Sequence, residues 1–412
     1  MPDRSPAAGA VTGLVVVGAS LAGLRAVERA RKAGYDGSIT LIGAEEHLPY
    51  DRPPLSKAYL LGESVPDPRF RTEDQLSELD VELVLGTPAT GLDTDSREVI
   101  AGRRVAYDAL VIATGARART LPGSEQLSGL HVLRTLDDAK ELRAALDSAP
   151  QHVVVVGAGF IGSEVASAAR ARGLAVTVVE AAQYPLTRSL GSELGVACSL
   201  LHERHGTRLR TGVGVAGLEG NGSVEKVQLT DGTVLEADLV VVGIGASPVV
   251  DWLEGSGVAV HDGVVCDETL ASSVAGVYAA GDVACWRNPL FGRAMRLEHW
   301  TSAAEQGAIA ASNALDPGQA RSYSTVPYFW SDWYGTRIQF VGVPGSDEHR
   351  VVAGSAEDGE LVALYREGDR LVGALVLDQP SSTMKYRGLI NRRTSWAEAL
   401  EFARARHGGA SL

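Results

Sequence analysis

The sequence predicts an α/β fold in which one domain is inserted into another of similar design. A strand–turn–helix–strand pattern occurs in residues 13–46 and again in residues 152–182. Two more apolar strands, in residues 107–119 and 276–284, each run into a glycine turn, and residues 237–248 resemble the first of them. This order indicates a first domain that the chain leaves near Arg119 and re-enters near Ser247.

Length and composition indicate a globular protein of two or three domains. The chain has 412 residues, of which 45% are hydrophobic and 22% charged. No apolar run reaches the roughly 20 residues that a membrane span needs. The opening MPDRSPAAGA lacks an apolar signal core, so we expect residues 1–12 to form a flexible tail and the protein to be cytoplasmic. The net charge of −13 argues against nucleic acid and anionic membranes as partners.

The cysteines form no recognisable redox or metal motif. Cys198, Cys266 and Cys285 are far apart, and the chain has no CxxC. We interpret them as buried small apolar residues. We therefore expect no metal site, iron–sulfur cluster or redox disulfide.

The second strand–turn–helix unit has a complete dinucleotide-binding pattern. Gly157, Gly159 and Gly162 stand at the positions of a tight turn, a close approach to pyrophosphate and close helix–strand packing. Glu180 ends the second strand, 23 residues after the first glycine, where a carboxylate can bind a ribose hydroxyl. A carboxylate there repels a 2′-phosphate, so the pattern predicts NAD rather than NADP. Arg188 lies nearby as a weaker contact.

The first unit follows the same pattern with one substitution. It reads Gly18, then Ser20 and Gly23, with serine in place of the middle glycine. Serine is small enough for a phosphate to approach the backbone. Glu45, 27 residues after Gly18, supplies the acid. Two such units predict two Rossmann-like dinucleotide-binding domains.

Three further segments carry a family resemblance. HLPYDRPPLSKAYL (residues 47–60, here called the strap), RNPLFGRAMRLEHW (287–300) and PYFWSDWYGTRIQFVG (327–342) resemble the FAD-dependent NADH:ferredoxin reductases of bacterial oxygenase systems. This is the putidaredoxin reductase and aromatic-dioxygenase reductase type within the pyridine nucleotide-disulfide oxidoreductase superfamily. The resemblance covers residues 13–406.

The resemblance implies a glutathione reductase-like fold with three domains. The FAD-binding domain would comprise residues 13–118 and 247–321, with the NAD-binding domain inserted as residues 119–246. A C-terminal α+β domain would occupy residues 322–412. The linker-like composition of residues 311–325 supports this last boundary.

The resemblance also implies two sets of cofactor contacts, carried over by position. Those for FAD are Gly18, Ala22, Gly23, Glu45, Arg52, Lys57, Ala89, Arg134, Asp282 and Trp300. Those for NADH are Gly159, Ile161, Gly162, Glu164, Glu180, Arg188 and Gly245. The chain departs from many relatives at Ala44, where they have an acid, and at Ser20.

Lys57 and Glu164 are the candidate catalytic residues. A fixed cation beside the flavin favours electron uptake, and Glu164, expected on the first turn of its helix, could hold Lys57 by a charge-assisted bond. Glu164 could also receive the nicotinamide carboxamide. The alternatives are a solvated surface lysine and a helix N-terminal acid. We expect the prolines of the strap to stiffen it, so that Lys57 lies within ion-pair reach of Glu164.

Other flavin-site candidates have ordinary structural alternatives. Asp282 could bind the ribityl chain or simply close a turn. Arg52 and Arg134 could contact the pyrophosphate or adenine side, or be surface arginines. Trp300 could line the flavin edge or belong to the core.

The absence of cysteine from the strap bears on where the electrons go. Disulfide reductases of this fold carry a cysteine pair there, and coenzyme A disulfide reductases and NADH oxidases a single cysteine. We therefore expect hydride from NADH to reduce FAD, and the electrons to pass singly to an acidic iron–sulfur ferredoxin that supplies a cytochrome P450 or a Rieske-type oxygenase. The alternatives are rubredoxin, a nitrite reductase module or a quinone as acceptor, or an NADH-sensing protein resembling apoptosis-inducing factor.

A basic surface is expected to dock the ferredoxin transiently, although the chain as a whole is acidic. The candidate basic residues are Lys385, Arg387, Arg392, Arg393, Arg404 and Arg406, with Arg69, Arg71, Arg293 and Arg296. Solvated helix faces are the alternative. The sequence leaves monomer and homodimer open.

Overall fold

The computed structural model describes residues 11–61, 65–123, 127–345 and 347–408. The chain divides into two compact units. The first comprises Met1–Asp51, Pro68–Arg117 and Ser247–Thr325; the second comprises Arg52–Asp67, Ala118–Ala246 and Val326–Leu412. The tail expected over residues 1–12 lies outside the described residues except for its last two positions. Among the helices of the described part, none is both long and apolar enough to cross a membrane.

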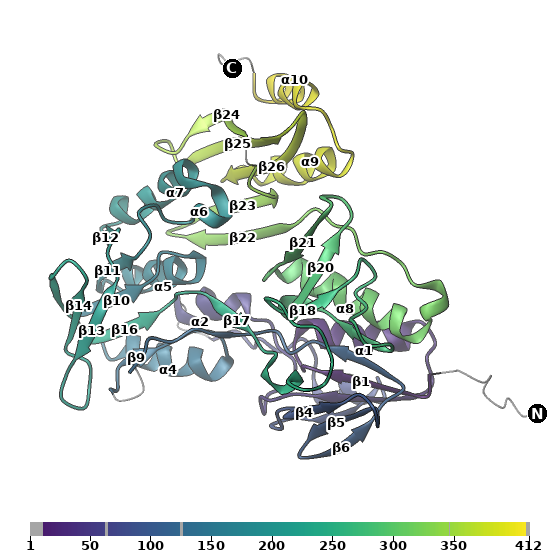
Figure 1. Cartoon of the computed structure of the whole chain (residues 1–412). Helices are drawn as coiled ribbons and strands as arrows, with labels where there is room; N and C mark the ends of the chain where they lie inside the picture. Colours follow the sequence, from purple (N-terminus) through teal and green to yellow (C-terminus); the bar gives the residue numbers. More distant parts are fainter. Residues whose placement is uncertain (1–10, 62–64, 124–126, 346, 409–412) are drawn as a thin grey trace, which may run out of the picture. The chain divides into compact units, whose positions relative to one another are not determined.

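The first unit is built on a five-stranded parallel sheet with the order β19-β7-β1-β2-β3. The strands are β1 (Gly13–Val17), β2 (Ser38–Ile42), β3 (Glu82–Val84), β7 (Ala109–Ile112) and β19 (Val277–Ala279). The apolar runs of β1, β2, β7 and β19 are buried on both faces, as in other parallel sheets, whereas β3 at the edge is only half-buried. Helix α1 (Leu21–Lys32) follows β1 and packs on α8 (Trp300–Leu315), as Figure 1 shows. A side chain at Gly307 of α8 would meet the carbonyl of Ala22, so the two helices approach closely.

Smaller elements complete the first unit. Two three-stranded sheets have the orders β4-β5-β6 and β18-β20-β21. Their strands are β4 (Gly91–Asp93), β5 (Glu98–Ala101), β6 (Arg103–Ala106), β18 (Val264–Cys266), β20 (Ala284–Asn288) and β21 (Arg293–Arg296). The short helices are α3 (Glu73–Ser77), η3 (Asp251–Leu253), η4 (Gly281–Val283) and η5 (Pro317–Gln319). Strands β8 (Ala116–Ala118) and β17 (Ala246–Pro248) stand where the chain passes from one unit to the other.

The second unit repeats the parallel design in the order β12-β11-β10-β16-β9. The strands are β9 (Leu130–His131), β10 (His152–Val156), β11 (Ala175–Glu180), β12 (Arg208–Thr211) and β16 (Leu239–Val242). One face packs under helices α4 (Leu136–Asp147) and α5 (Phe160–Ala171), and the other under β13 (Val215–Glu219), β14 (Lys226–Leu229) and β15 (Val234–Glu236). Helices α6 (Thr187–Leu190) and α7 (Ser192–Arg204) follow β11. The predicted α/β fold with two such sheets is confirmed.

The C-terminal part of the second unit is an antiparallel sheet with the order β22-β23-β26-β25-β24. Its strands are β22 (Tyr328–Trp333), β23 (Thr336–Gly342), β24 (Glu348–Ser355), β25 (Glu360–Glu367) and β26 (Arg370–Leu377). Helices α9 (Pro380–Asn391) and α10 (Trp396–His407) pack against it, α9 on β26 and β23 and α10 on β24 (Figure 1). The predicted α+β character of this part is confirmed.

The linker interpretation of residues 311–325 is wrong at its start. Helix α8 continues to Leu315, because Ala311 and Ala314 are buried. Asn313 then binds the following loop, since its amide donates to the carbonyl of Arg321 (2.9 Å) and its oxygen accepts the Arg321 N–H (2.9 Å). Tyr323 is buried and donates to Glu305 (2.8 Å). Composition missed these side-chain bonds.

Candidate functional site

Both glycine turns adopt backbone conformations that other residues rarely take. Gly18 has φ +122° and Gly157 has φ +104°, and an added Cβ would lie 2.0 Å and 2.4 Å from the carbonyl oxygens of Ala113 and Gly243. Gly159 differs, because an added Cβ there would meet only one atom, 3.9 Å away. Packing within the chain therefore does not explain glycine at position 159. An open approach to the N-terminus of α5 does.

Glu180 is hydrogen-bonded to the glycine turn between β10 and α5, next to which it was expected to lie. Its carboxylate accepts the backbone N–H of Ala158 (2.9 Å) and of Ala182 (2.8 Å). The acid at the end of β11 is thus placed beside the N-terminus of α5, where Gly159 is the N-cap and makes no side-chain capping bond. The backbone N–H groups of this first turn remain available to an anion.

The remaining residues predicted to contact NADH lie in the same unit. Gly162 packs in α5 against Gly157, and the side chain of Ile161 is 46% exposed. Gly245, with φ +94°, follows β16. Arg188 is exposed on α6, and among the described residues no hydrogen bond links it to another predicted site residue.

In the first unit, the predicted flavin contacts follow the ends of the parallel strands. Ala22 and Gly23 are buried in α1, and Glu45 accepts a hydrogen bond from Tyr50. Ala89 is half-buried between β3 and β4.

Asp282 and Trp300 are each tied into the first unit. Asp282 lies in η4, whose first residue, Gly281, donates its N–H to the buried Gln306 of α8 (2.8 Å). Trp300 begins α8 and donates from Nε1 to Asp51 (2.7 Å). Trp300 is half-buried, so it is neither a core tryptophan nor a fully exposed one.

From Arg52 onward the strap belongs to the second unit. After Arg52 the chain forms η1 (Pro53–Ser56) and then α2 (Ala58–Leu61). Leu60 is fully buried in the core beneath α4 and α5. Arg143 of α4 donates to the carbonyl of Tyr59 (2.6 Å), and Arg172 at the end of α5 donates to that of Leu60 (2.8 Å). The chain that follows Lys57 is therefore fixed.

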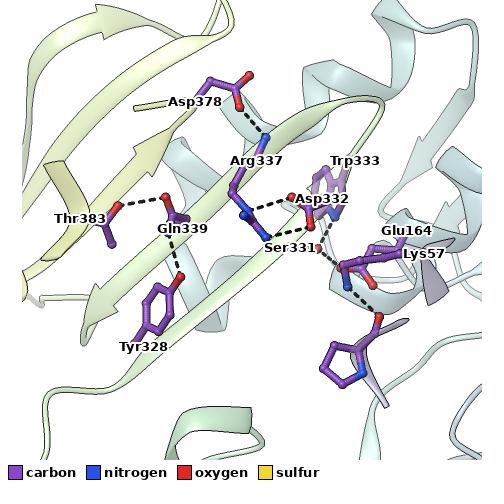
Figure 2. A network of polar contacts seen from close by, with 11 residues as sticks. Lys57, Glu164, Tyr328, Ser331, Asp332, Trp333, Arg337, Gln339, Asp378 and Thr383 are labelled. Atoms are coloured by element: carbon purple, nitrogen blue, oxygen red, sulfur yellow. Dashed lines mark hydrogen bonds and ion pairs between the residues drawn. The ribbon is translucent and has the colours of Figure 1, made fainter. Parts of the chain in front are cut away.

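Lys57 and Glu164 form the expected ion pair, with 2.8 Å between Nζ and Oε1 (Figure 2). The side chain of Glu164 is only 2% exposed and that of Lys57 is 19% exposed. Lys57 also donates to the carbonyl of Pro53 (3.3 Å). The alternative of a solvated surface lysine is excluded.

The expected position of Glu164 within its helix is wrong. Helix α5 begins at Phe160, and its first turn has no acidic residue. Glu164 opens the second turn, because Gly159 stays extended as the N-cap. An interaction with the helix N-terminal dipole therefore does not account for the burial of Glu164. Its hydrogen-bond partners do.

Sequence reasoning missed those partners. Ser56 donates to one carboxylate oxygen of Glu164 and Ser331 of β22 donates to the other. Trp333 donates from its indole to Ser331 Oγ (2.7 Å). The serines are 108 and 167 residues from Glu164, so no local pattern joins them. Alternation along β22 was the available signal, because Phe329, Ser331 and Trp333 share one face.

A second buried cluster joins α5, α7 and the end of β22. His202 of α7 bonds Ser163 Oγ (3.1 Å) and the hydroxyl of Tyr334 (2.8 Å), and its ring stacks on Trp333. Tyr334 also bonds Thr207 (2.8 Å), and its N–H donates to Ser167 (2.7 Å). Burial, and secondarily His205, lowers the pKa of His202 to about 4, so the ring is neutral at neutral pH.

Arg52 and Arg134 are brought together, with Arg52 donating to the carbonyl of Arg134 (2.6 Å). Arg134 in turn donates its N–H to Asp138 at the start of α4 (2.9 Å). Both arginines belong to the second unit.

The basic residues considered for docking fall into three groups. Arg71 pairs with Glu28 (2.6 Å) and Arg296 with Glu298 (2.7 Å), so each of these charges has an acidic partner within the chain. Arg387 and Arg406 are half-buried and donate to Val326 and Ser382. The exposed ones are Lys385, Arg392, Arg393 and Arg404 in the C-terminal part, and Arg69 and Arg293 in the first unit.

Two of the three cysteines lie in the buried environment that was expected, but the expectation is wrong for Cys285, which is only half-buried. Cys198 and Cys266 are buried, and burial raises the pKa of each thiol to about 12. Thiols of this kind are inert, because the thiolate is the reactive form.

Two family models match the chain. Residues 12–307 match the pyridine nucleotide-disulphide oxidoreductase model, and residues 328–403 match the reductase C-terminal model. Rhodocoxin reductase of Rhodococcus erythropolis is 37% identical over 384 residues, covering 92% of this chain and 89% of that protein. A rubredoxin–NAD(+) reductase of Pseudomonas putida is 37% identical over 373 residues, covering 89% and 96%. The solved covalent complex of putidaredoxin reductase with putidaredoxin matches with a TM-score of 0.89 at 32% identity, covering 97% of this chain and 99% of that one.

Proposed function

The chain belongs to the pyridine nucleotide-disulphide oxidoreductase family, with its reductase C-terminal domain, and we propose that it is an NADH-dependent ferredoxin reductase. Electrons from NADH would pass through FAD, one at a time, to an iron–sulfur ferredoxin. The ferredoxin would supply a cytochrome P450 or a Rieske-type oxygenase in the cytoplasm. The putidaredoxin complex and rhodocoxin reductase support this choice of acceptor.

The residues present fit both cofactors of the family. In the second unit, an open N-terminus of α5 and the carboxylate of Glu180 suit the pyrophosphate and the ribose of NADH. In the first unit, α1 also begins without a side-chain cap, at Ser20, and Glu45 follows the neighbouring strand. When bound, FAD supplies the conversion between a two-electron donor and a one-electron acceptor.

The chain itself contributes a held cation and a rigid support for it. Glu164 lies 2.8 Å from Lys57, and the chain that follows the lysine is anchored through the carbonyls of Tyr59 and Leu60. A fixed positive charge stabilises negative charge that develops nearby, without reorganisation during the reaction. The strap carries no cysteine, so it offers electrons no thiol route. This ion pair, buried at the strap, is the observation that carries the proposal.

The test is an anaerobic titration of the purified protein. We expect a yellow protein that NADH bleaches at about one equivalent and that NADPH bleaches far less. NADH-driven cytochrome c reduction should then depend on added iron–sulfur ferredoxin. A colourless protein that does not respond to NADH after incubation with FAD would refute the proposal.

Rubredoxin is the second candidate acceptor. A rubredoxin–NAD(+) reductase is as similar to this chain as rhodocoxin reductase is, at 37% identity. Parallel assays with a ferredoxin, a rubredoxin and a quinone separate the possibilities by kcat/KM. Preference for rubredoxin would replace the ferredoxin, while leaving the roles of FAD and NADH unchanged.

A further inference from the structure

Glu164 is the point where three segments far apart in the sequence meet. Lys57 of the strap lies 2.8 Å from its Oε1. Ser331, on β22 of the C-terminal sheet, donates to the same oxygen, and Ser56 donates to Oε2. A carboxylate that is 2% exposed needs such donors, since water does not reach it.

The bond from Ser331 has a fixed direction. An indole N–H can donate but cannot accept, so Trp333 must donate to Ser331 Oγ across their 2.7 Å contact. The hydroxyl of Ser331 has one proton. Because Ser331 accepts from Trp333, it donates this proton in a hydrogen bond to Glu164 (Figure 2). Trp333, Ser331 and Glu164 thus form a one-way chain of hydrogen bonds.

Trp333 is held where the chain of bonds requires it. Its side chain is fully buried, its ring lies 5.9 Å from that of Phe160, and it stacks on His202 at 5.6 Å. Phe160 begins the helix that carries Glu164, so both ends of the chain rest on α5. A side chain locked by packing loses little entropy on bonding.

We propose that Trp333 and Ser331 are positioning residues that fix Glu164, and through it Lys57, so that the C-terminal sheet sets the orientation of the catalytic ion pair. The positioning of Glu164 by Ser331 and Trp333 requires no bound cofactor. The expected effect of this positioning on electron transfer rests on the proposed function.

A double-mutant cycle tests the chain of bonds. Ser331→Ala removes the bond to Glu164, and Trp333→Phe removes the indole donor while keeping an aromatic ring. We expect Ser331→Ala to lower kcat for NADH-driven ferricyanide reduction about tenfold, with KM for NADH changed less than about twofold. The double variant should match Ser331→Ala within about twofold, because both changes act through one bond. Effects that multiply in the double variant would overturn the proposal.

Two further variants separate positioning from general damage. Ser331→Thr keeps the hydroxyl and should recover most of the kcat lost in Ser331→Ala. Ser56→Ala is the matched control, since Ser56 contacts the other carboxylate oxygen. Its effect should persist in the Ser331→Ala background, whereas that of Trp333→Phe should vanish there.

A spectroscopic readout does not depend on activity. The sequence contains only five lysines, so the 13C-dimethyl resonances of a reductively methylated sample can be assigned by single Lys→Arg variants. In Ser331→Ala and Trp333→Phe the resonance of Lys57 should move, while that of the exposed Lys385 should not. An unmoved Lys57 resonance in Ser331→Ala would overturn the proposal even in an active reductase. A wild-type protein that neither binds flavin nor responds to NADH would refute the function but leave this readout valid.

Discussion

The carboxylate of Glu180 accepts a 2.9 Å hydrogen bond from the backbone N–H of Ala158, between the first two glycines of the nucleotide-binding turn. Its other oxygen accepts from Ala182 (2.8 Å). Glu180 therefore braces this turn. We propose that the same carboxylate also binds a ribose hydroxyl of NADH.

Replacing Glu180 with arginine should change coenzyme preference at a cost to both coenzymes. Removing the carboxylate takes away the repulsion of a 2′-phosphate, so the ratio of kcat/KM for NADH to that for NADPH should fall about tenfold or more. Loss of the brace should lower kcat/KM for NADH as well. Steady-state kinetics with both coenzymes check this.

The matched control for that charge reversal is Glu203→Arg. Glu203 is exposed on α7 of the same unit, and its reversal changes the net charge equally. We expect no change in coenzyme preference there. An unchanged ratio in Glu180→Arg would mean that Glu180 does not read the ribose.

The buried ion pair makes a prediction about stability. Lys57→Met leaves Glu164, 2% exposed, without its cation, and should lower the free energy of unfolding by about 3 kcal/mol. The 19% exposure of Lys57 keeps this at the low end of the range for buried pairs. Adding Glu164→Gln should recover part of the loss. Urea unfolding measures each variant.

Lys140→Met is the comparison for the buried pair. Lys140 lies 2.7 Å from Asp137, but the two side chains are 49% and 60% exposed. Removing this charge should cost less than about 1 kcal/mol. If Lys57→Met and Lys140→Met lowered the free energy of unfolding equally, the burial of Glu164 would add nothing to the strength of the Lys57–Glu164 pair.

Local patterns in the sequence predicted most of the fold. Apolar β-branched runs between glycine turns predicted the parallel strands, because strand burial and tight turns are short-range properties. The end of α8 was missed, since the side chain of Asn313 binds a loop that composition alone describes as a linker. The sequence prediction placed Glu164 in the first turn of α5. In the structure Gly159 is an extended N-cap and α5 begins at Phe160, so Glu164 lies in the second turn.

The candidate site was predicted less completely. The Lys57–Glu164 pair was expected only through the family resemblance, and its 2.8 Å contact confirms the expectation. Ser56, Ser331 and Trp333 were missed because a buried carboxylate can be satisfied by any donor that the tertiary fold brings to it. A serine 167 residues away has no local signal of that role.

His202 should make the stability of the protein sensitive to acid. Burial lowers its pKa to about 4, from about 6.5 in the unfolded chain. Between these values the unfolded chain binds a proton that the folded chain excludes, so stability is fully present above about pH 6.5 and declines as pH falls to about 4. The total loss from this residue is on the order of 3 kcal/mol.

Urea unfolding of His202→Gln at pH 7.5 and pH 5 tests this. The variant should be less stable at pH 7.5 but should lose less stability on acidification than the wild type. Some loss remains, because burial also lowers the pKa of His299 to about 4. His261→Gln, at an exposed position, is the control and should follow the wild type. An unchanged pH dependence in His202→Gln would contradict the role of burial.

Ferredoxin-coupled turnover should weaken as ionic strength rises. The exposed basic residues of the C-terminal part, Lys385, Arg392, Arg393 and Arg404, are the candidates to attract an acidic partner. Charge reversal at Arg393 or Arg404 should raise KM for ferredoxin about three- to tenfold at low salt, with less effect at high salt. Ferricyanide reduction requires no docked protein and should change little.

Arg71→Glu is the control variant, because Arg71 is paired with Glu28, and it should leave the salt dependence of ferredoxin-coupled turnover unaltered. Turnover with ferredoxin that is insensitive to salt would exclude electrostatic docking by this surface.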